Sequence, residues 1–167
     1  QADELAKVLH KNNNNEFQVL VAMRYWHPFS EEAVKAVKAF NPDTVVLLPL
    51  YPQFSTTTSD SSIKEWKRIA KANNLDVNTK LVCCYPEHID FIKAYAELTL
   101  PVVSNAADKH EKVRVLFSAH GLPQKIVDQG DPYQWQVEQS VASLWKVMGV
   151  NNPNVNYTIT YQSRVGP

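Results

Sequence analysis

The amino-acid sequence predicts an α/β fold in which parallel sheets are flanked by helices. Apolar runs with the length of strands alternate with amphipathic helical segments along the 167 residues. Two of these runs, FQVLVAMRY over 17–25 and TVVLLPLY over 44–51, are apolar almost throughout, as strands buried on both faces are. Strands that alternate with helices form parallel sheets with right-handed crossovers, so we expect this architecture here.

Apolar periodicity and capping residues mark the elements of the first half of the chain. A helix comes first, because Leu5, Val8 and Leu9 share one helical face. Ser30, followed by Glu31 and Glu32, gives the next helix an N-cap and an acidic first turn. The predicted elements are a helix over 1–11, a strand over 17–25, a helix over 30–40, a strand over 44–51, a Ser/Thr-rich loop over 53–62 and a helix over 63–72.

Proline and glycine mark the elements of the second half. Pro101 should close a long helix, because proline lacks the backbone N–H that continues a helix. Asp131-Pro132 should open the last helix, and Gly149 should end it. The predicted elements are a strand over 80–85, a helix over 87–100, a strand over 112–119, a helix over 131–148 and a strand over 155–162.

Composition excludes several classes of function. The 17 basic and 17 acidic residues give a formal net charge of zero, which provides no electrostatic surface for nucleic acid or an anionic membrane. The longest apolar run is far shorter than the roughly 18 residues of a membrane-spanning helix. With only 4 glycines, neither GxGxxG nor GxxxxGK[ST] can be written in this chain, which excludes nucleotide binding through those loops.

The two cysteines, Cys83 and Cys84, are adjacent and form no CxxC motif. Neighbouring cysteines rarely pair and free cysteines are mostly buried, so we expect two buried thiols on a strand. The N-terminal segment lacks the basic end and apolar core of a secretory signal. Both features favour a reducing compartment. The expected location is the bacterial cytoplasm, with the mitochondrion as the alternative.

Polar and aromatic residues follow each predicted strand. Open α/β sheets bind ligands outside the carboxyl ends of their strands, so these residues should gather at a site. The segments concerned are RYWH over 24–27, YPQFS over 51–55, YPEH over 85–88, HGLP over 120–123 and QSR over 162–164.

His120 is the most distinctive of these strand-end residues. It ends a hydrophobic strand and is followed at once by Gly121, with Pro123 close behind, so a tight turn should fix its backbone. Imidazole titrates near neutrality and is a common metal ligand, so His120 can accept a proton, hold a divalent ion, or serve as a structural hydrogen-bonding residue. A hydrolase site with Ser118 as nucleophile is disfavoured, because the glycines of an oxyanion hole are absent.

The segment FSAHGLP over 117–123 resembles the FSAHxLP signature of ferrochelatases, which insert Fe²⁺ into a porphyrin in the last step of haem synthesis. Four further segments resemble motifs of the same family, in the same order along the chain. They are MRYWHP over 23–28 (RYxxP), YPQFS with TTS over 51–59 (YPQYS…T), GDPY over 130–133 (GDPY) and YQSRVGP over 161–167 (WQSxVGP).

This resemblance implies two Rossmann-like half-domains with a porphyrin cleft between them. The chain would hold the later part of the first half over 1–80 and the earlier part of the second over 81–167, with both sheets incomplete. The family also carries an essential glutamate beyond its WQSxVGP stretch, which lies outside residues 1–167. We therefore expect this chain on its own to insert little or no metal.

The resemblance also implies roles for individual residues. His120 would bind the incoming metal or accept a pyrrole proton, and His88 would belong to an outer metal site. Arg24, Tyr25, Tyr85 and Ser118 would line the porphyrin pocket, although ordinary half-buried packing is an alternative for the two tyrosines.

The implied partners are a porphyrin and Fe²⁺ as substrates, with no nucleic acid and at most a weak membrane association. No cofactor is required in this chain, and an iron–sulfur cluster and the oligomeric state stay open. Two rival interpretations remain. One is a chelatase for another divalent metal such as cobalt, because ligand softness does not separate Fe²⁺ from Co²⁺. The other is a tetrapyrrole-binding module without catalysis.

Overall fold

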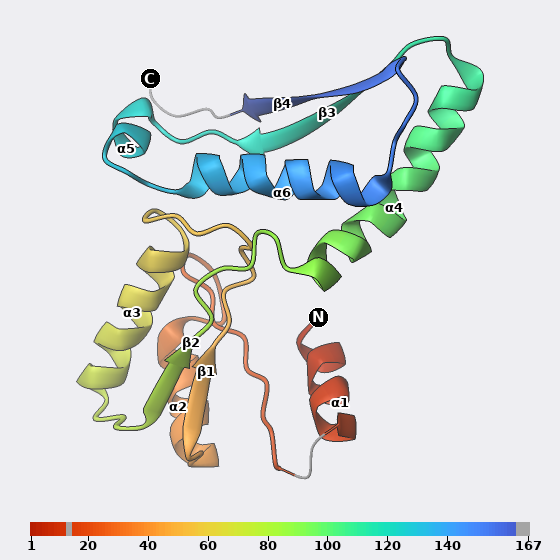
Figure 1. Ribbon diagram of the computed structural model, residues 1–167. Coiled ribbons are helices and arrows are strands. Elements are labelled where there is room, and N and C mark those ends of the chain that lie inside the picture. The colour runs from red at the N-terminus through yellow and green to blue at the C-terminus, as the bar shows by residue number, and fades with distance from the viewer. Residues whose placement is uncertain (13–14, 163–167) are drawn as a thin grey trace. The chain divides into compact units, whose positions relative to one another are not determined.

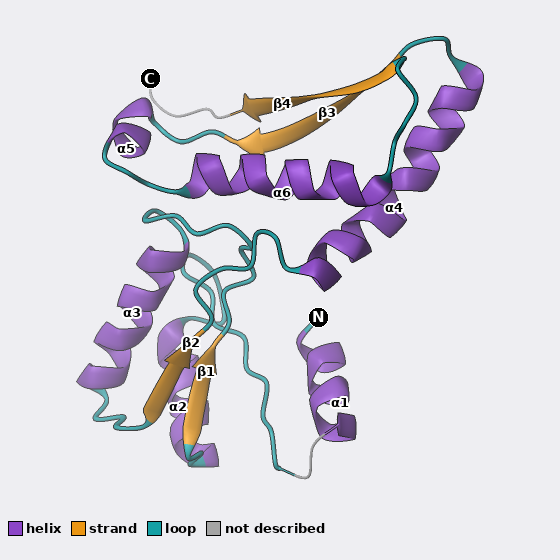
Figure 2. Ribbon diagram, in the orientation of Figure 1, coloured by secondary structure: helices purple, strands orange, loops and turns teal. Residues whose placement is uncertain are grey.

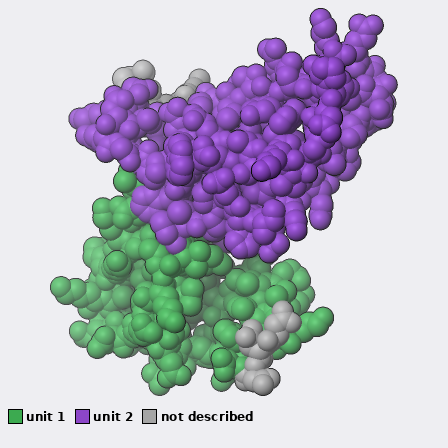
Figure 3. Space-filling view, viewed as in Figure 1, with its two compact units in different colours: residues 1–49, 56–82 green, residues 50–55, 83–167 purple. Residues whose placement is uncertain are grey.

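A computed structural model describes residues 1–12 and 15–162, and the chain divides into two compact units. The first unit comprises residues 1–49 and 56–82, and the second comprises residues 50–55 and 83–167 (Figure 3). Each unit holds a parallel two-stranded sheet with helices packed against it (Figure 1 and Figure 2). This mixed α/β architecture confirms the predicted fold class.

The first unit contains three helices and two strands among the described residues. Its helices are α1 (Ala2–Asn12), α2 (Ser30–Phe40) and α3 (Ser59–Ala72), and its strands are β1 (Thr44–Leu47) and β2 (Asn78–Leu81). The Glu32 carboxylate accepts a hydrogen bond from the Phe29 backbone N–H at the start of α2, over 2.9 Å. Asn41 ends this helix in the left-handed conformation, with φ of 52°, which asparagine tolerates better than most residues.

The core of the first unit lies between its sheet and two of its helices. Buried side chains of α2 and α3 pack against Val45 and Leu47, which point to the same face of β1. Val46, between them, points to the other face and is 57% exposed. The buried core residues are Ala33, Val34, Val37, Trp66 and Ile69.

The second unit is built on the longer sheet. Its elements are α4 (Ile89–Lys109), β3 (Val113–His120), α5 (Gln124–Asp128), α6 (Tyr133–Met148) and β4 (Val155–Gln162). Strands β3 and β4 pair in parallel over their whole length, from Val113 opposite Val155 to His120 opposite Gln162. Gly149 ends α6 with φ of 62°, a conformation that glycine adopts without the steric cost of a Cβ atom.

Helices α4 and α6 cover one face of this sheet. Ile92 and Ala96 of α4 form a buried cluster with Leu144 and Met148 of α6, and Phe117 of β3 packs against the cluster. The aromatic rings of Phe117, Trp145 and Tyr157 extend this packing along the sheet. On β3 the residues alternate between half-buried and exposed, so every second side chain points away from the helices.

Three predictions about individual elements are wrong. Residues 17–25 form no strand, and only Met23 makes an isolated bridge, to Phe29. Pro101 does not close the long helix but lies inside α4, which continues to Lys109. The short helix α5 occupies a segment for which no helix or strand was predicted. Strand β1 ends earlier than the predicted 51, and β2 covers 78–81 instead of the predicted 80–85, because the two strands pair only over 44–47 and 78–81.

Candidate functional site

His120 is the last residue of β3, and its side chain is exposed. By strand alternation it shares a face with Ser118 and Leu116, opposite the face on which Phe117 meets α4 and α6. The next residue, Gly121, donates a backbone hydrogen bond to the Gln162 carbonyl over 2.9 Å, so β4 fixes the turn that follows His120. The imidazole and the Ser118 hydroxyl thus belong to the carboxyl end of a parallel strand, where such sheets bind ligands.

A carboxylate and two phenols lie near the ends of the same two strands. Glu138 of α6 accepts hydrogen bonds from the Tyr161 hydroxyl over 3.4 Å and from the Gln134 amide over 3.1 Å. Burial, and then the neighbouring Glu138, raise the pKa of Tyr161 to about 12. Burial also raises the pKa of Tyr133, and the backbone of His120 partly offsets that rise. Both phenols therefore keep their protons at neutral pH, next to the backbone that carries His120.

Two loops of the second unit are fixed on α6 by polar side chains that the sequence analysis did not single out. Gln136 accepts a hydrogen bond from the Phe54 backbone N–H over 2.7 Å. The Ser140 hydroxyl accepts one from the Gln53 amide over 2.8 Å and donates one to the Pro86 carbonyl over 2.7 Å. The loops over 50–55 and 83–88, which carry two of the predicted strand-end segments, thus dock on one helix.

A sequence signal for this docking was present. Gln136 and Ser140 are four residues apart, so they share a helical face, and each adjoins a buried valine, Val137 or Val141. Polar residues on the buried side of an amphipathic helix need hydrogen-bond partners. Here those partners come from loops that are distant in the sequence. The pattern therefore indicates that α6 makes a polar docking contact, but it does not identify the partner residues.

Ser55 and Asp131 form a buried polar contact in this unit. The Ser55 hydroxyl, 1% exposed, donates a hydrogen bond to one carboxylate oxygen of Asp131 over 3.0 Å. The other carboxylate oxygen accepts the Tyr133 backbone N–H at the first residue of α6, over 3.0 Å. Asp131 therefore connects the loop over 50–55 to the start of the helix that carries Tyr133 and Glu138.

Tyr85 and His88 lie before the first turn of α4. Tyr85 is half-buried with its ring edge-on to Phe91, 5.8 Å between centroids, and burial raises the pKa of its phenol. Its backbone N–H donates to the Pro52 carbonyl over 2.8 Å. His88 is exposed and immediately precedes α4, and its neighbour Glu87 accepts a hydrogen bond from Ser143 of α6 over 2.8 Å.

Arg24 and Tyr25 belong to the first unit. Arg24 is half-buried, and its Nε donates to the hydroxyl of Ser61, in the first turn of α3, over 3.1 Å. Its guanidinium carbon also lies 4.7 Å from the centroid of the Tyr25 ring, within the range of a cation–π contact. Tyr25 itself is 73% exposed, so its ring is available to a ligand.

The expectation of two buried thiols is wrong, because Cys83 is exposed and Cys84 half-buried. Within residues 1–12 and 15–162, no group of three or more His, Cys, Asp and Glu side chains is arranged to hold a metal ion. His120 and His88 are therefore not part of such a group there. In the same part of the chain, no helix is long and apolar enough to cross a membrane. The strand-end residues Ser163 and Arg164 lie outside the described residues.

Comparison with known proteins decides the family. The ferrochelatase family model matches residues 1–167, which is the whole length of the chain and includes His120 with its flanking motif. The chain belongs to the ferrochelatase family. The resemblance that five short motifs indicated is thereby confirmed over residues 1–167.

Individual ferrochelatases are similar to this chain over nearly all of its residues. It is 46% identical over 167 residues to the ferrochelatase of Wolbachia sp. subsp. Drosophila simulans (strain wRi), covering 100% of this chain and 52% of that protein. It is 47% identical over 163 residues to that of Rickettsia bellii (strain OSU 85-389), covering 98% and 43%. For Pelagibacter ubique (strain HTCC1062) the identity is 45% over 154 residues, covering 92% and 43%. The chain thus spans about half the length of these relatives.

Proposed function

We propose that this chain forms part of an enzyme that inserts Fe²⁺ into a porphyrin, protoporphyrin IX, with release of two protons, the terminal step of haem synthesis. The observation that carries this proposal is the ferrochelatase match over residues 1–167. It is supported by the position of FSAHGLP, which begins in β3 and continues past His120, the exposed last residue of that strand. The reaction is a lyase-type chelation in which Fe²⁺ is a substrate, and we propose that the residues of this chain need no resident cofactor.

His120 is the residue to which we assign the chemistry. A porphyrin must lose two pyrrole N–H protons when a dication enters, and the charge then balances: two positive charges enter and two leave. A neutral imidazole is a suitable acceptor for a departing proton. The exposed side chain of His120 can approach a flat ligand on the open face of β3, while β4 and the turn at Gly121 hold its backbone. In this proposal His120 accepts a proton or receives the metal, and His88 serves an outer metal site.

We assign the porphyrin contacts to Tyr85 and Ser118 in the second unit and to Arg24 and Tyr25 in the first. The exposed Tyr25 ring and the half-buried Tyr85 ring offer apolar faces to a large planar ligand. Arg24 can pair with a propionate carboxylate or stack on the macrocycle. Its hydrogen bond to Ser61 restricts the guanidinium to one region, so that less conformational entropy is lost on binding.

The location and partners of the whole protein follow from the same proposal. Its substrates are the porphyrin and Fe²⁺, and we place the reaction in the bacterial cytoplasm, in keeping with the bacterial relatives. A chelatase for Co²⁺ is the second candidate, because imidazole binds both ions.

A chimaera tests the proposal. The segment of the Wolbachia wRi ferrochelatase that matches this chain would be replaced by residues 1–167, and metalloporphyrin formation would be followed by absorption with Fe²⁺ and, separately, Co²⁺. We expect insertion of Fe²⁺ in preference to Co²⁺, and little or none by the 167-residue chain alone. A folded chimaera that binds porphyrin, seen as quenched fluorescence, but inserts neither ion would overturn the proposal in favour of a binding module.

A further inference from the structure

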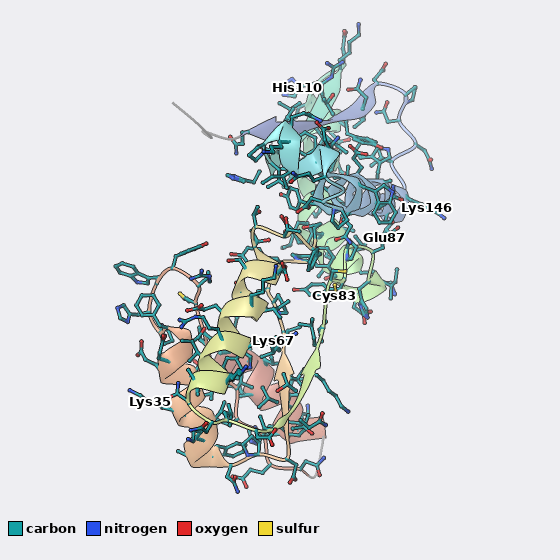
Figure 4. All side chains as sticks on the ribbon, turned by 90° about the vertical axis from the view of Figure 1, so that its left-hand side faces the viewer. Lys35, Lys67, Cys83, Glu87, His110 and Lys146 are labelled. Carbon is teal, nitrogen blue, oxygen red and sulfur yellow. The ribbon has the colours of Figure 1, made fainter. Side chains whose placement is uncertain are left out.

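The two cysteines form a pair of neighbouring thiols that the proposed function does not use. Cys83 and Cys84 follow β2 after one intervening residue, Val82, and Figure 4 labels Cys83 near the place where the chain leaves that strand. The two residues are consecutive in the chain, the Cys84 thiol is one cause of the raised pKa of Cys83, and neither forms a disulfide. Cys83 is exposed and Cys84 half-buried, so reagents can reach the pair from solvent.

The surroundings hold the pair in place. The Gln136 amide nitrogen lies 3.7 Å from the Cys84 sulfur, within the range of a weak hydrogen bond, while the Gln136 carbonyl oxygen is engaged by Phe54. The residue after the pair, Tyr85, is fixed by its backbone hydrogen bond to Pro52. Burial, and then the contact with Cys84, raise the pKa of the Cys83 thiol, so Cys83 is protonated at neutral pH and a slow nucleophile.

From this geometry we propose that Cys83 and Cys84 are a dithiol site for trivalent organoarsenicals. Zn²⁺ sites in proteins normally have three or four protein ligands, and the described residues contain no His, Cys, Asp and Glu group of three or more arranged to hold a metal. An arsenic(III) centre that already carries one carbon substituent needs only two sulfurs. The thiols of two consecutive residues, one exposed and one half-buried, can supply both.

The binding step is a condensation without redox change. The hydrated arsenical R–As(OH)₂ exchanges its two As–O bonds for two As–S bonds, and each departing hydroxide takes the proton of one thiol and leaves as water. Because the second As–S bond forms within one molecule, its effective thiol concentration is high, and the adduct resists free monothiols. This proposal is independent of the proposed chelatase function.

Mass spectrometry of the intact chain tests the proposal. The probe is phenylarsine oxide in the presence of excess 2-mercaptoethanol, applied to the wild-type chain, Cys83→Ser and Cys84→Ser. The chain contains only these 2 cysteines, so each variant keeps one thiol. We expect one phenylarsenic group per wild-type chain, removed by 2,3-dimercaptopropanol. The two variants should need a reagent concentration at least about a hundredfold higher to reach the same degree of labelling.

Two results would overturn the proposal. One is retention of the group by either serine variant at the reagent concentration that saturates the wild type, and the other is two groups on one wild-type chain. Because Cys83 is exposed, Cys83→Ser should fold, and circular dichroism checks this. A second readout is alkylation by N-ethylmaleimide, from which the bound arsenical should protect both cysteines at once. Protection of only one cysteine would also contradict the proposal.

Discussion

The buried hydroxyl of Ser55 donates a hydrogen bond to the Asp131 carboxylate over 3.0 Å, joining residues that are 76 positions apart in the sequence. Asp131 also accepts the backbone N–H of Tyr133, so one side chain stabilises both a loop and the start of α6. A buried side-chain hydrogen bond of this kind holds the loop, which has no sheet or helix of its own, against the start of α6.

Loss of the Asp131 carboxylate should therefore destabilise the second unit. Asp131→Ala removes both hydrogen bonds and leaves the buried Ser55 hydroxyl with one partner fewer, so we expect the free energy of unfolding to fall by about 2–4 kcal/mol. Ser55→Ala should cost less, about 1–2 kcal/mol. Urea unfolding followed by circular dichroism measures both, with the exposed Asp128→Ala as matched control. If Asp128→Ala lowered the free energy of unfolding as much as Asp131→Ala does, the stabilising role of the Asp131 hydrogen bonds would be contradicted.

Removal of Pro101 should stabilise α4. Proline at this exposed interior position cannot donate a backbone hydrogen bond to the preceding turn of the helix, and such a residue costs a helix about 3 kcal/mol relative to alanine. We expect Pro101→Ala to raise the free energy of unfolding by about 1–3 kcal/mol and to increase the helical signal. The neighbouring, exposed Val102→Ala is the control. A decrease in stability for Pro101→Ala would contradict this prediction and show that proline at this position is needed for packing.

The titration of Tyr161 gives a pH-dependent prediction. Its pKa is about 12 in the folded chain, whereas an unperturbed tyrosine titrates near 10. The folded state therefore keeps a proton that the unfolded state loses, so this contribution to stability is complete below about pH 10 and is lost as the pH rises toward 12. Ultraviolet difference titration of the wild-type chain and Tyr161→Phe should show one phenol titrating near pH 12 in the wild type only.

Glu138→Gln separates the causes of that pKa rise. Burial is the largest cause and the charge of Glu138 the second, so the substitution should lower the pKa of Tyr161 only part of the way toward 10. Glu97→Gln, on the exposed side of α4, should leave it unchanged. A complete return to 10 in Glu138→Gln would mean that the carboxylate, and not burial, dominates.

Ser61 is predicted to act through Arg24. If Arg24 meets a porphyrin carboxylate, Ser61→Ala removes the hydrogen bond that positions its guanidinium, and porphyrin affinity in the chimaera should fall about two- to tenfold with kcat little changed. The neighbouring Ser62→Ala is the control. Fluorescence quenching gives the affinity, and an equal loss in both variants would indicate a general effect on α3 instead.

Local signals were sufficient to predict much of this fold. The strand over 155–162 and the end of α6 at Gly149 were placed correctly, because alternation and a left-handed glycine depend on nearby residues. The segment over 17–25 was not, since a strand exists only where another strand pairs with it. No partner ladder forms for that segment within the part of the chain that the structure describes. The prediction that the helix ends at Pro101 was wrong for a related reason. The buried residues Ile92, Ala96 and Val103 pack on both sides of the proline, so α4 continues past it.

The candidate residues at strand ends could be predicted from the sequence, whereas the hydrogen bonds that hold the neighbouring loops in place could not. His120 and Tyr85 were identified because each lies at the end of an apolar run, which is a local pattern. The contacts of Ser55 with Asp131 and of Gln53 with Ser140 join residues 76 and 87 positions apart, and no periodicity in one sequence pairs such positions. The fold alone brings these side chains together.

The most direct test of the account is His120→Ala in the Wolbachia chimaera, with porphyrin binding and Fe²⁺ insertion measured on the same preparation. The exposed His110, labelled in Figure 4, supplies the control substitution His110→Ala. We predict that His120→Ala retains porphyrin binding within a few-fold and loses insertion by about 10²- to 10⁴-fold, as removal of a general base does. His110→Ala should retain both binding and insertion. Insertion at the wild-type rate in His120→Ala would contradict the assignment of the chemistry to this residue.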